Sequence, residues 1–428
     1  MALVAPSSVT AQPDTGQETP RYTSALASLT VLFFMMGFIT CLNDILIPYL
    51  KGLFTLSYAK VNLVNFCFFG AYLVMGVPAG MLVKRLGYKG GMLVGFLVAA
   101  LGCFLFFPAA ESRTFGLFLG ALFVLATGIV TLQVAGNPYV AILGPAATAS
   151  SRLTLTQAFN SLATTIAPIL GARLILSHLP DLTKLSAPQA AALDVTSVQY
   201  LYLGIGTVLL LISGLLLFLK LPTIAHAPAP AGDTQRAWHY RHLVLGLVGI
   251  FAYVGAEVAI GSHIVSYLSQ SEVMGMPARS AGEQVAFYWG AAMVGRFLGI
   301  GVLRKLNPGR VLAFNAVGAV VLVLISINTS GAVAMWSLLA VGLMNSIMFP
   351  VIFTLAVAGL GRHTEDASGL LSAAIVGGAI IPPLFGLIAD STSGGGGVHA
   401  LRLAFILPVL CYCYIVWYGL RGSRPSVA

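Results

Sequence analysis

The chain has 428 residues, of which 58% are hydrophobic and only 8% are charged. Because a soluble domain carries about 25% charged residues, this composition and a mean hydropathy of +0.93 exclude an ordinary soluble domain and predict an integral membrane protein. The net charge of +9 does not indicate a nucleic-acid partner, since the basic residues are scattered between apolar runs and form no basic face.

Residues 1–24 are polar, lack the layout of a signal peptide, and are expected to form a disordered cytoplasmic tail. Apolar runs then recur along the whole chain, and an α-helix needs about 20 apolar residues to cross a bilayer. These runs predict an all-α membrane protein with twelve transmembrane helices, at roughly 25–50, 60–83, 89–109, 114–143, 152–177, 199–220, 242–269, 281–303, 309–328, 332–359, 367–389 and 398–420.

A polar, Pro/Ala-rich segment at 221–241 divides these helices into two sets of six. We therefore expect an N-terminal bundle over 25–220, a cytoplasmic linker at 221–241, a C-terminal bundle over 242–420 and a cytoplasmic tail at 421–428. Loops and tails on the side of the N-terminus hold fourteen basic residues, against six on the other side. This bias predicts that both termini are cytoplasmic.

The two sets also resemble each other. Gly70-Ala71 recurs as Gly290-Ala291 and Lys84-Arg85 recurs as Arg304-Lys305, both at an offset of 220. The repeat favours two pseudo-symmetric bundles that rock about a site at the midplane, although short turns could acquire glycine and basic residues independently. The basic turns, with Lys84, Arg85 and Arg304, are expected to anchor loops and lipid or to latch the cytoplasmic side in one state.

Asp44 is the one acid within the apolar run at 30–51. A charge at the centre of a membrane helix costs about 2.5–3.5 kcal/mol on insertion scales, so the carboxyl is expected to face a central, water-accessible cavity. Three polar residues precede prolines in corresponding helices, namely Asp44 before Pro48, Gln133 before Pro138 and Asn345 before Pro350. Proline frees a backbone carbonyl, and polar groups at such kinks are tolerated beside a cavity, or else join helices through hydrogen bonds.

Other polar residues are candidates for the same cavity. Gln157 and Asn160 share a helix face and offer the neutral donors and acceptors that an uncharged sugar needs. Glu257 is a second intramembrane acid, for which substrate binding, an ion pair with Arg296 and proton binding all remain open. Trp289 either stacks on a sugar ring or packs as an ordinary aromatic residue. Arg296 is expected to act as a gate or as a structural ion-pair partner.

Several tracts resemble a known family. GMLVKRLGYKGG (80–91) is similar to the helix 2–3 loop signature of the major facilitator superfamily, with Lys84 where an aspartate is usual. NDILIPYL, LQVAGNPYV, RLTLTQAFNSLATT, GLMNSIMFPVIF and SGLLSAAIVGGAIIPPLFGLIAD resemble the fucose–galactose–glucose proton symporters, and most of all their glucose/galactose branch.

This resemblance implies the major facilitator fold, a hexose substrate and a transport role for the carboxylate of helix 1, which is Asp44. The fucose branch has a glutamate where this chain has Gln133, which cannot titrate and is therefore expected to recognise the sugar. Asn137, in the same tract, and Gln157 and Asn160, which match polar substrate-side positions, are expected to join it in the substrate site.

We therefore expect an importer of glucose or galactose that works by alternating access, with a proton carried by Asp44. An uncoupled facilitator and a sodium-coupled symporter remain alternatives, the latter because Asp44 and Asn43 offer hard oxygen ligands. A proton-driven efflux transporter is more remote.

The sequence shows no nucleophile–base set and no metal-ligand spacing among its cysteines, so we expect neither an enzyme nor a metal or organic cofactor. The expected partners are a monosaccharide and the lipid bilayer, and we expect a monomer in a bacterial inner membrane.

Overall fold

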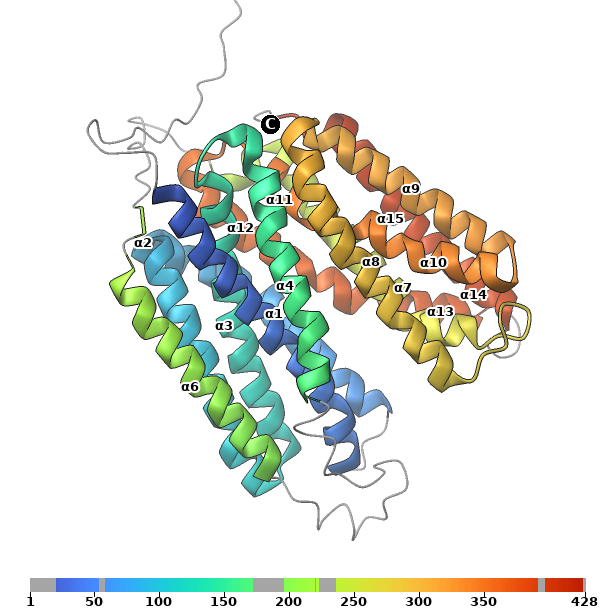
Figure 1. The fold of residues 1–428 in the computed structure, drawn as a ribbon, viewed down its shortest axis with the longest axis horizontal. Helices are drawn as coiled ribbons and strands as arrows, with labels where there is room; N and C mark the ends of the chain where they lie inside the picture. Colours follow the sequence, from blue (N-terminus) through green and yellow to red (C-terminus); the bar gives the residue numbers. More distant parts are fainter. Residues whose placement is uncertain are drawn as a thin grey trace, which may run out of the picture.

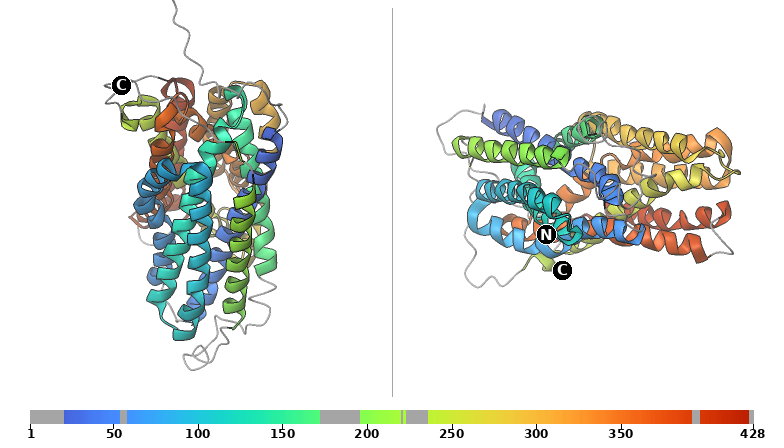
Figure 2. Two further views of the ribbon diagram at one scale, coloured as in Figure 1. Left: turned by 90° about the vertical axis from the view of Figure 1, so that its left-hand side faces the viewer. Right: turned by 90° about the horizontal axis from the view of Figure 1, so that it is seen from below.

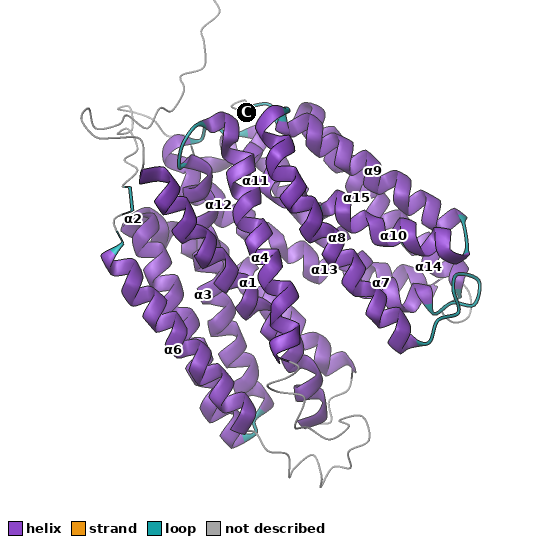
Figure 3. Cartoon of the chain, in the orientation of Figure 1, coloured by secondary structure: helices purple, strands orange, loops and turns teal. Residues whose placement is uncertain are grey.

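The structure is a computed structural model that describes residues 21–53, 58–171, 196–219, 221–222, 236–391 and 397–425. Its elements are all helical (Figures 1 and 3). The N-terminal half contains α1 (Arg21–Leu53), α2 (Tyr58–Ser112), α3 (Phe115–Ile142), α4 (Ala149–Gly171) and α6 (Thr196–Phe218). The C-terminal half contains α7 (Arg241–Leu268), α8 (Ala278–Lys305), α9 (Pro308–Asn328), α10 (Gly331–Asn345), α11 (Met348–Ala356), α12 (Thr364–Ala373), α13 (Gly377–Ser391), α14 (Val398–Ala404) and α15 (Ile406–Trp417).

The predicted order of membrane-spanning helices is confirmed. Within the described residues, 10 helical segments are long and apolar enough to cross a membrane. One of them, Phe66–Ser112, holds two predicted spans that meet at Gly87, whose φ of 72° interrupts the helix and suits a residue without a Cβ. The serine- and threonine-rich α4 lies at the position of a further predicted span but is not among these ten segments, while α10–α11, α12–α13 and α14–α15 are single spans with breaks.

The boundaries differ from the prediction mainly at the N-terminus. Helix α1 begins at Arg21, so 21–24 of the expected disordered tail are helical. The prediction for 1–20 and for most of the linker lies outside the described residues, as does that for 426–428. A short 3-10 turn at Ala237–His239 leads directly into α7.

The two halves meet at one end of the molecule and spread apart toward the other (Figure 1), and seen from below they lie side by side (Figure 2). Helices α2 and α12 form one of the contacts between the halves. There a Cβ on Gly369 would lie 2.6 Å from the carbonyl oxygen of Gly76, so the close approach depends on glycine.

Helices α4 and α8 form the second contact between the halves. The Ser151 hydroxyl donates to the carbonyl oxygen of Ile300 at 2.8 Å. The rings of Phe159 and Phe297 lie 6.0 Å apart. The halves are therefore held together by small residues and by bonds to backbone carbonyls as well as by apolar packing, as is usual between membrane helices.

Candidate functional site

Amide side chains gather inside the N-terminal half. In α3, Gln133 donates through Nε2 to the hydroxyl of Tyr72 at 3.1 Å. One turn further on, Asn137 is fully buried and its Oδ1 accepts from Nε2 of Gln157 in α4 at 3.4 Å. The Nδ2 atom of Asn137 has no partner within the described part of the chain. The three amides, predicted separately from the sequence, form with Tyr72 one set of neutral donors and acceptors on α2, α3 and α4.

Asn160 joins α4 to α1. Its Nδ2 donates to the carbonyl oxygen of Phe33 at 2.9 Å. This contact requires Gly37, because a Cβ there would lie 2.8 Å from the same Nδ2 atom. The first half of α1 is thus held against the helix that carries Gln157.

Asp44 belongs to α1. Its side chain, like those of Asn43 and Pro48, lies outside the described residues, and the cavity predicted around it remains a prediction.

A second set of polar side chains lies in the C-terminal half, around Glu257 of α7. The hydroxyl of Tyr288 in α8 donates to the backbone carbonyl of Glu257 at 3.2 Å and accepts from Nδ2 of Asn345 at 2.8 Å. Glu257 is 8% exposed and Asn345 is fully buried. Trp289 is 43% exposed and its ring meets that of Tyr288 edge-on at 5.1 Å, so it lies at the margin of this set.

Pro138 and Pro350 each leave one backbone carbonyl without its helical donor, as predicted from the sequence. Pro138 has no N–H to donate to the carbonyl of Val134, which instead accepts from the hydroxyl of Ser368 at 2.9 Å. Pro350 likewise leaves the carbonyl of Ser346 free, and Nε of Arg296 donates to it at 3.2 Å. The helix breaks at this second position, between α10 and α11.

Arg296 does not form the ion pair that was considered for it. Within the described part of the chain, no basic nitrogen lies within ion-pair distance of the Glu257 carboxyl, although Arg296 lies close enough to act on it electrostatically. The guanidinium is held by the freed carbonyl of Ser346 instead. Arg296 of α8 therefore binds the carbonyl that Pro350 leaves free, and not the carboxyl of Glu257.

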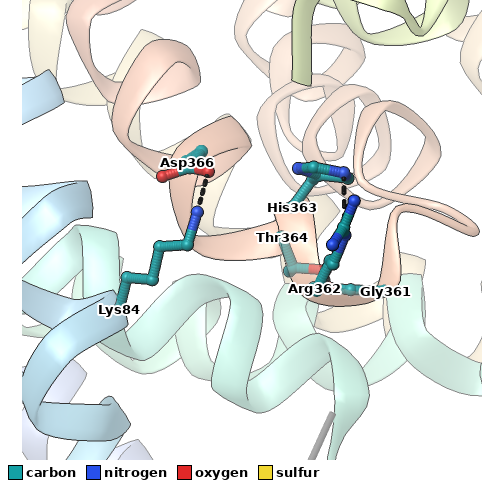
Figure 4. Close-up of polar contacts among 6 residues, drawn as sticks. All are labelled: Lys84, Gly361, Arg362, His363, Thr364 and Asp366. Carbon is teal, nitrogen blue, oxygen red and sulfur yellow. Dashed lines mark hydrogen bonds and ion pairs between the residues drawn. The ribbon is translucent and has the colours of Figure 1, made fainter. Parts of the chain in front are cut away.

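Lys84 reaches from α2 to Asp366 in α12, with 2.5 Å between Nζ and Oδ2 (Figure 4). The two side chains are 49% and 28% exposed, so this ion pair lies at the surface of the contact between the halves. Arg85 and Arg304 are exposed, and neither takes part in an ion pair with another described residue.

The sequence analysis missed Asp366 and the tyrosines that surround the amides and Glu257. These tyrosines are Tyr72, Tyr253, Tyr288 and Tyr412. A tyrosine in an apolar run reads as a packing residue, yet a buried hydroxyl usually seeks a hydrogen-bond partner. That requirement is the signal by which they could have been found.

Long apolar helices in two halves, with polar side chains buried inside them, define a multi-pass membrane protein. The chain belongs to the Major Facilitator Superfamily, which it matches over residues 27–383, as its tracts predicted. It is 54% identical to the glucose/galactose transporter of Brucella abortus (strain 9-941) over 406 residues, which cover 94% of this chain and 95% of that protein.

The chain is also 34% identical to the L-fucose-proton symporter of Escherichia coli (strain K12), over 96% of each chain. Its fold matches the crystal structure of the transporter FucP in the outward conformation, with a TM-score of 0.84 and 34% identity, covering 93% of this chain and 98% of that one. The expected family is therefore confirmed, and it is a family of transporters.

Proposed function

We propose that this protein imports a hexose, glucose or galactose, by alternating access, and that a proton bound at Asp44 is coupled to the sugar. The observation that carries the proposal is the set formed by the half-buried Gln133 and Gln157 and the buried Asn137, in a chain 54% identical to a glucose/galactose transporter. Uncharged amides both donate and accept, and so match the hydroxyls of an uncharged sugar without drawing in a counter-ion.

Proton coupling follows from the position of Asp44 in the sequence of a membrane helix. An ionised carboxylate opposes closure of the protein around it, because leaving water costs several kcal/mol. A proton and a sugar that both favour the closed form would drive the same transition, and this shared preference is what coupling requires.

The likeness to an outward structure supports an outward-facing arrangement here. Together with the distribution of basic residues, it supports a cytoplasmic position for the end held by Lys84 and Asp366. We infer that the protein works as a monomer in the bacterial inner membrane, with both termini in the cytoplasm.

An uncoupled hexose facilitator is the second candidate, and one specific observation favours it. Gln133 is an amide bonded to Tyr72, where the fucose branch of the resemblance has a glutamate, so a titrating group of that branch is missing. Sodium coupling through Asp44 is the third candidate.

Uptake of labelled glucose by proteoliposomes, with an imposed proton gradient, tests the proposal. Wild type should accumulate glucose uphill, and Asp44→Asn should lose accumulation but keep exchange of sugar across the membrane. Asp390→Asn, an exposed carboxylate in α13, is the matched control and should behave as wild type.

Each alternative has its own signature in this assay. Uphill uptake that persists in Asp44→Asn removes the proton role from Asp44. Wild-type uptake that never exceeds equilibrium indicates a facilitator, and uptake that needs sodium at fixed pH indicates sodium coupling. Uptake that unlabelled glucose, galactose and other monosaccharides fail to inhibit contradicts the hexose substrate.

A further inference from the structure

Among the buried polar atoms of the C-terminal half that make no hydrogen bond of regular geometry within the described residues, four belong to side chains that lie together. They are the hydroxyls of Tyr253 and Tyr412, Oε1 of Glu257 and Oδ1 of Asn345. All four residues are more than nine-tenths buried, with exposed fractions of 1%, 0%, 8% and 0% respectively. Buried polar groups are normally paired, and the carboxyl of Glu257 has no ion-pair partner in the described part of the chain.

Direct contacts show that these atoms form one cluster. The Tyr288 hydroxyl bridges the backbone of Glu257 and the amide of Asn345. The Tyr253 hydroxyl lies beside the Glu257 carboxyl as a donor, and Arg296 acts on the same carboxyl electrostatically. Asn345 lies beside the Tyr412 hydroxyl, on which Glu257 also acts electrostatically. The cluster therefore consists of side chains from α7, α8, α10 and α15. Arg296 is the charged side chain that acts on the carboxyl of Glu257.

The charge state of the carboxyl follows from its surroundings. An ionised carboxylate with one oxygen enclosed and unpaired is costly by several kcal/mol. The nearby Arg296, which would be its natural partner, is bound to the carbonyl of Ser346 instead. A protonated carboxyl removes the charge, and the Tyr253 hydroxyl beside it can both donate and accept a hydrogen bond.

A sodium ion suits this cluster less well than a proton does. The oxygen atoms of the cluster are hard ligands of the kind that sodium prefers. The guanidinium of Arg296 is close to the Glu257 carboxyl, however, and its positive charge would repel a sodium ion bound there. A proton bound to the carboxyl adds no free cation beside the arginine.

We propose that Glu257 is a proton-binding site in the C-terminal half, which holds its proton in this conformation. Release of the proton to water leaves a carboxylate that draws Arg296 away from the carbonyl of Ser346. The effect of this proton on transport rests on the proposed function, whereas proton binding at Glu257 does not, because it needs no sugar.

If Arg296 moved from the carbonyl of Ser346 to the carboxyl of Glu257, the change would occur where the helix is broken between α10 and α11. Ser346 lies at the break between α10 and α11, and Asn345 of the cluster directly precedes it. Helix α11 touches the other half through Thr354, whose hydroxyl lies 2.6 Å from that of Ser150 in α4. Proton release at Glu257 would therefore reach a contact between the halves through the broken helix α10–α11.

Infrared difference spectroscopy of the full-length purified protein, stepped between acid and alkaline pH without sugar, tests the site directly. Wild type should show a protonated-carboxyl C=O band that disappears in Glu257→Gln. Glu257→Asp, which keeps a carboxyl, should retain the band at a shifted frequency, and it serves if the glutamine variant does not fold. Glu272→Gln, which removes a solvent-exposed carboxylate, is the matched control, and Asp44→Asn separates the two acids.

An unchanged band in Glu257→Gln overturns the proposal, as does loss of the band on adding sodium at constant pH. Equilibrium exchange of labelled glucose supplies the transport readout. In an Asp44→Asn background, which keeps exchange, exchange should fall at alkaline pH, and the addition of Glu257→Gln should abolish that fall. If glucose proves not to be a substrate, the proposed function fails but the infrared test of Glu257 remains valid. If glucose uptake is normal but no infrared band depends on Glu257, the proton site at Glu257 is contradicted and the proposed function is not.

Discussion

The hydroxyl of Ser368 in α12 donates to the carbonyl oxygen of Val134 in α3 at 2.9 Å, across 234 residues of sequence. That carbonyl is available because Pro138, four residues later, has no N–H to offer it. A proline in one half thus prepares an acceptor for a serine in the other, and the bond helps to hold the two halves together.

Ser368→Ala should destabilise the protein by about 1–3 kcal/mol, because a buried acceptor loses its donor. Ser372→Ala is the matched control on the same helix, since this buried hydroxyl has no partner in the described part of the chain, and it should change stability little. Thermal unfolding in detergent measures both. In a Pro138→Ala background, where the helix regains its own donor, Ser368→Ala should be milder, and equal effects in both backgrounds would contradict the explanation.

Removing the ion pair between Lys84 and Asp366 should favour separation of the halves at this end. The side chains are 49% and 28% exposed, so the pair contributes about 0.2–1 kcal/mol and its loss shifts the population by at most about fivefold. Distances between spin labels placed at Glu111 and Asn328, on the two halves, measure this shift in Lys84→Ala. Arg85→Ala removes a neighbouring exposed charge as the control, and the reversed pair Lys84→Asp with Asp366→Lys should restore the wild-type distribution.

Gly37→Ala should separate α1 from α4, since the added Cβ would lie 2.8 Å from Nδ2 of Asn160. Overpacking of this kind costs about 1–3 kcal/mol, and it should also reduce sugar uptake by moving the helix that carries Asp44. Gly70→Ala is the control, because a Cβ there meets nothing within 4 Å. Unfolding midpoints and initial uptake rates of the two variants give the comparison, and equal behaviour would rule out the close contact.

Gln133→Ala should weaken sugar binding by about twofold to tenfold, the equivalent of one hydrogen bond of about 0.5–1.5 kcal/mol. Competition binding with glucose measures the change. Gln270→Ala removes an exposed amide that bonds only to its own helix, at Ser266, and should leave affinity unchanged. Gln133→Glu, which introduces a titrating group beside Tyr72, should make affinity depend on pH, and a flat pH profile would argue against a place for this residue in the site.

Much of the architecture could be read from the sequence, because the bilayer imposes a simple rule on it. An apolar run of sufficient length becomes a helix whose backbone satisfies its own hydrogen bonds, so the positions of the apolar runs along the chain predicted most of the helices. The prolines at Pro138 and Pro350 also predicted where carbonyls would be freed. The clustering of Gln133 with Gln157 could be suspected from their resemblance to one family, but not from their spacing.

What the sequence could not determine was which partner each polar side chain would take. Ser346 and Val134 offered free carbonyls, but only the packing of α8 and α12 against them selected Arg296 and Ser368 as donors. An ion pair between Glu257 and Arg296 was one of three open alternatives, and in the structure Nε of Arg296 binds the carbonyl of Ser346 instead. Helices are local and follow from neighbouring residues, whereas hydrogen bonds between helices depend on rotations and distances that the whole fold fixes.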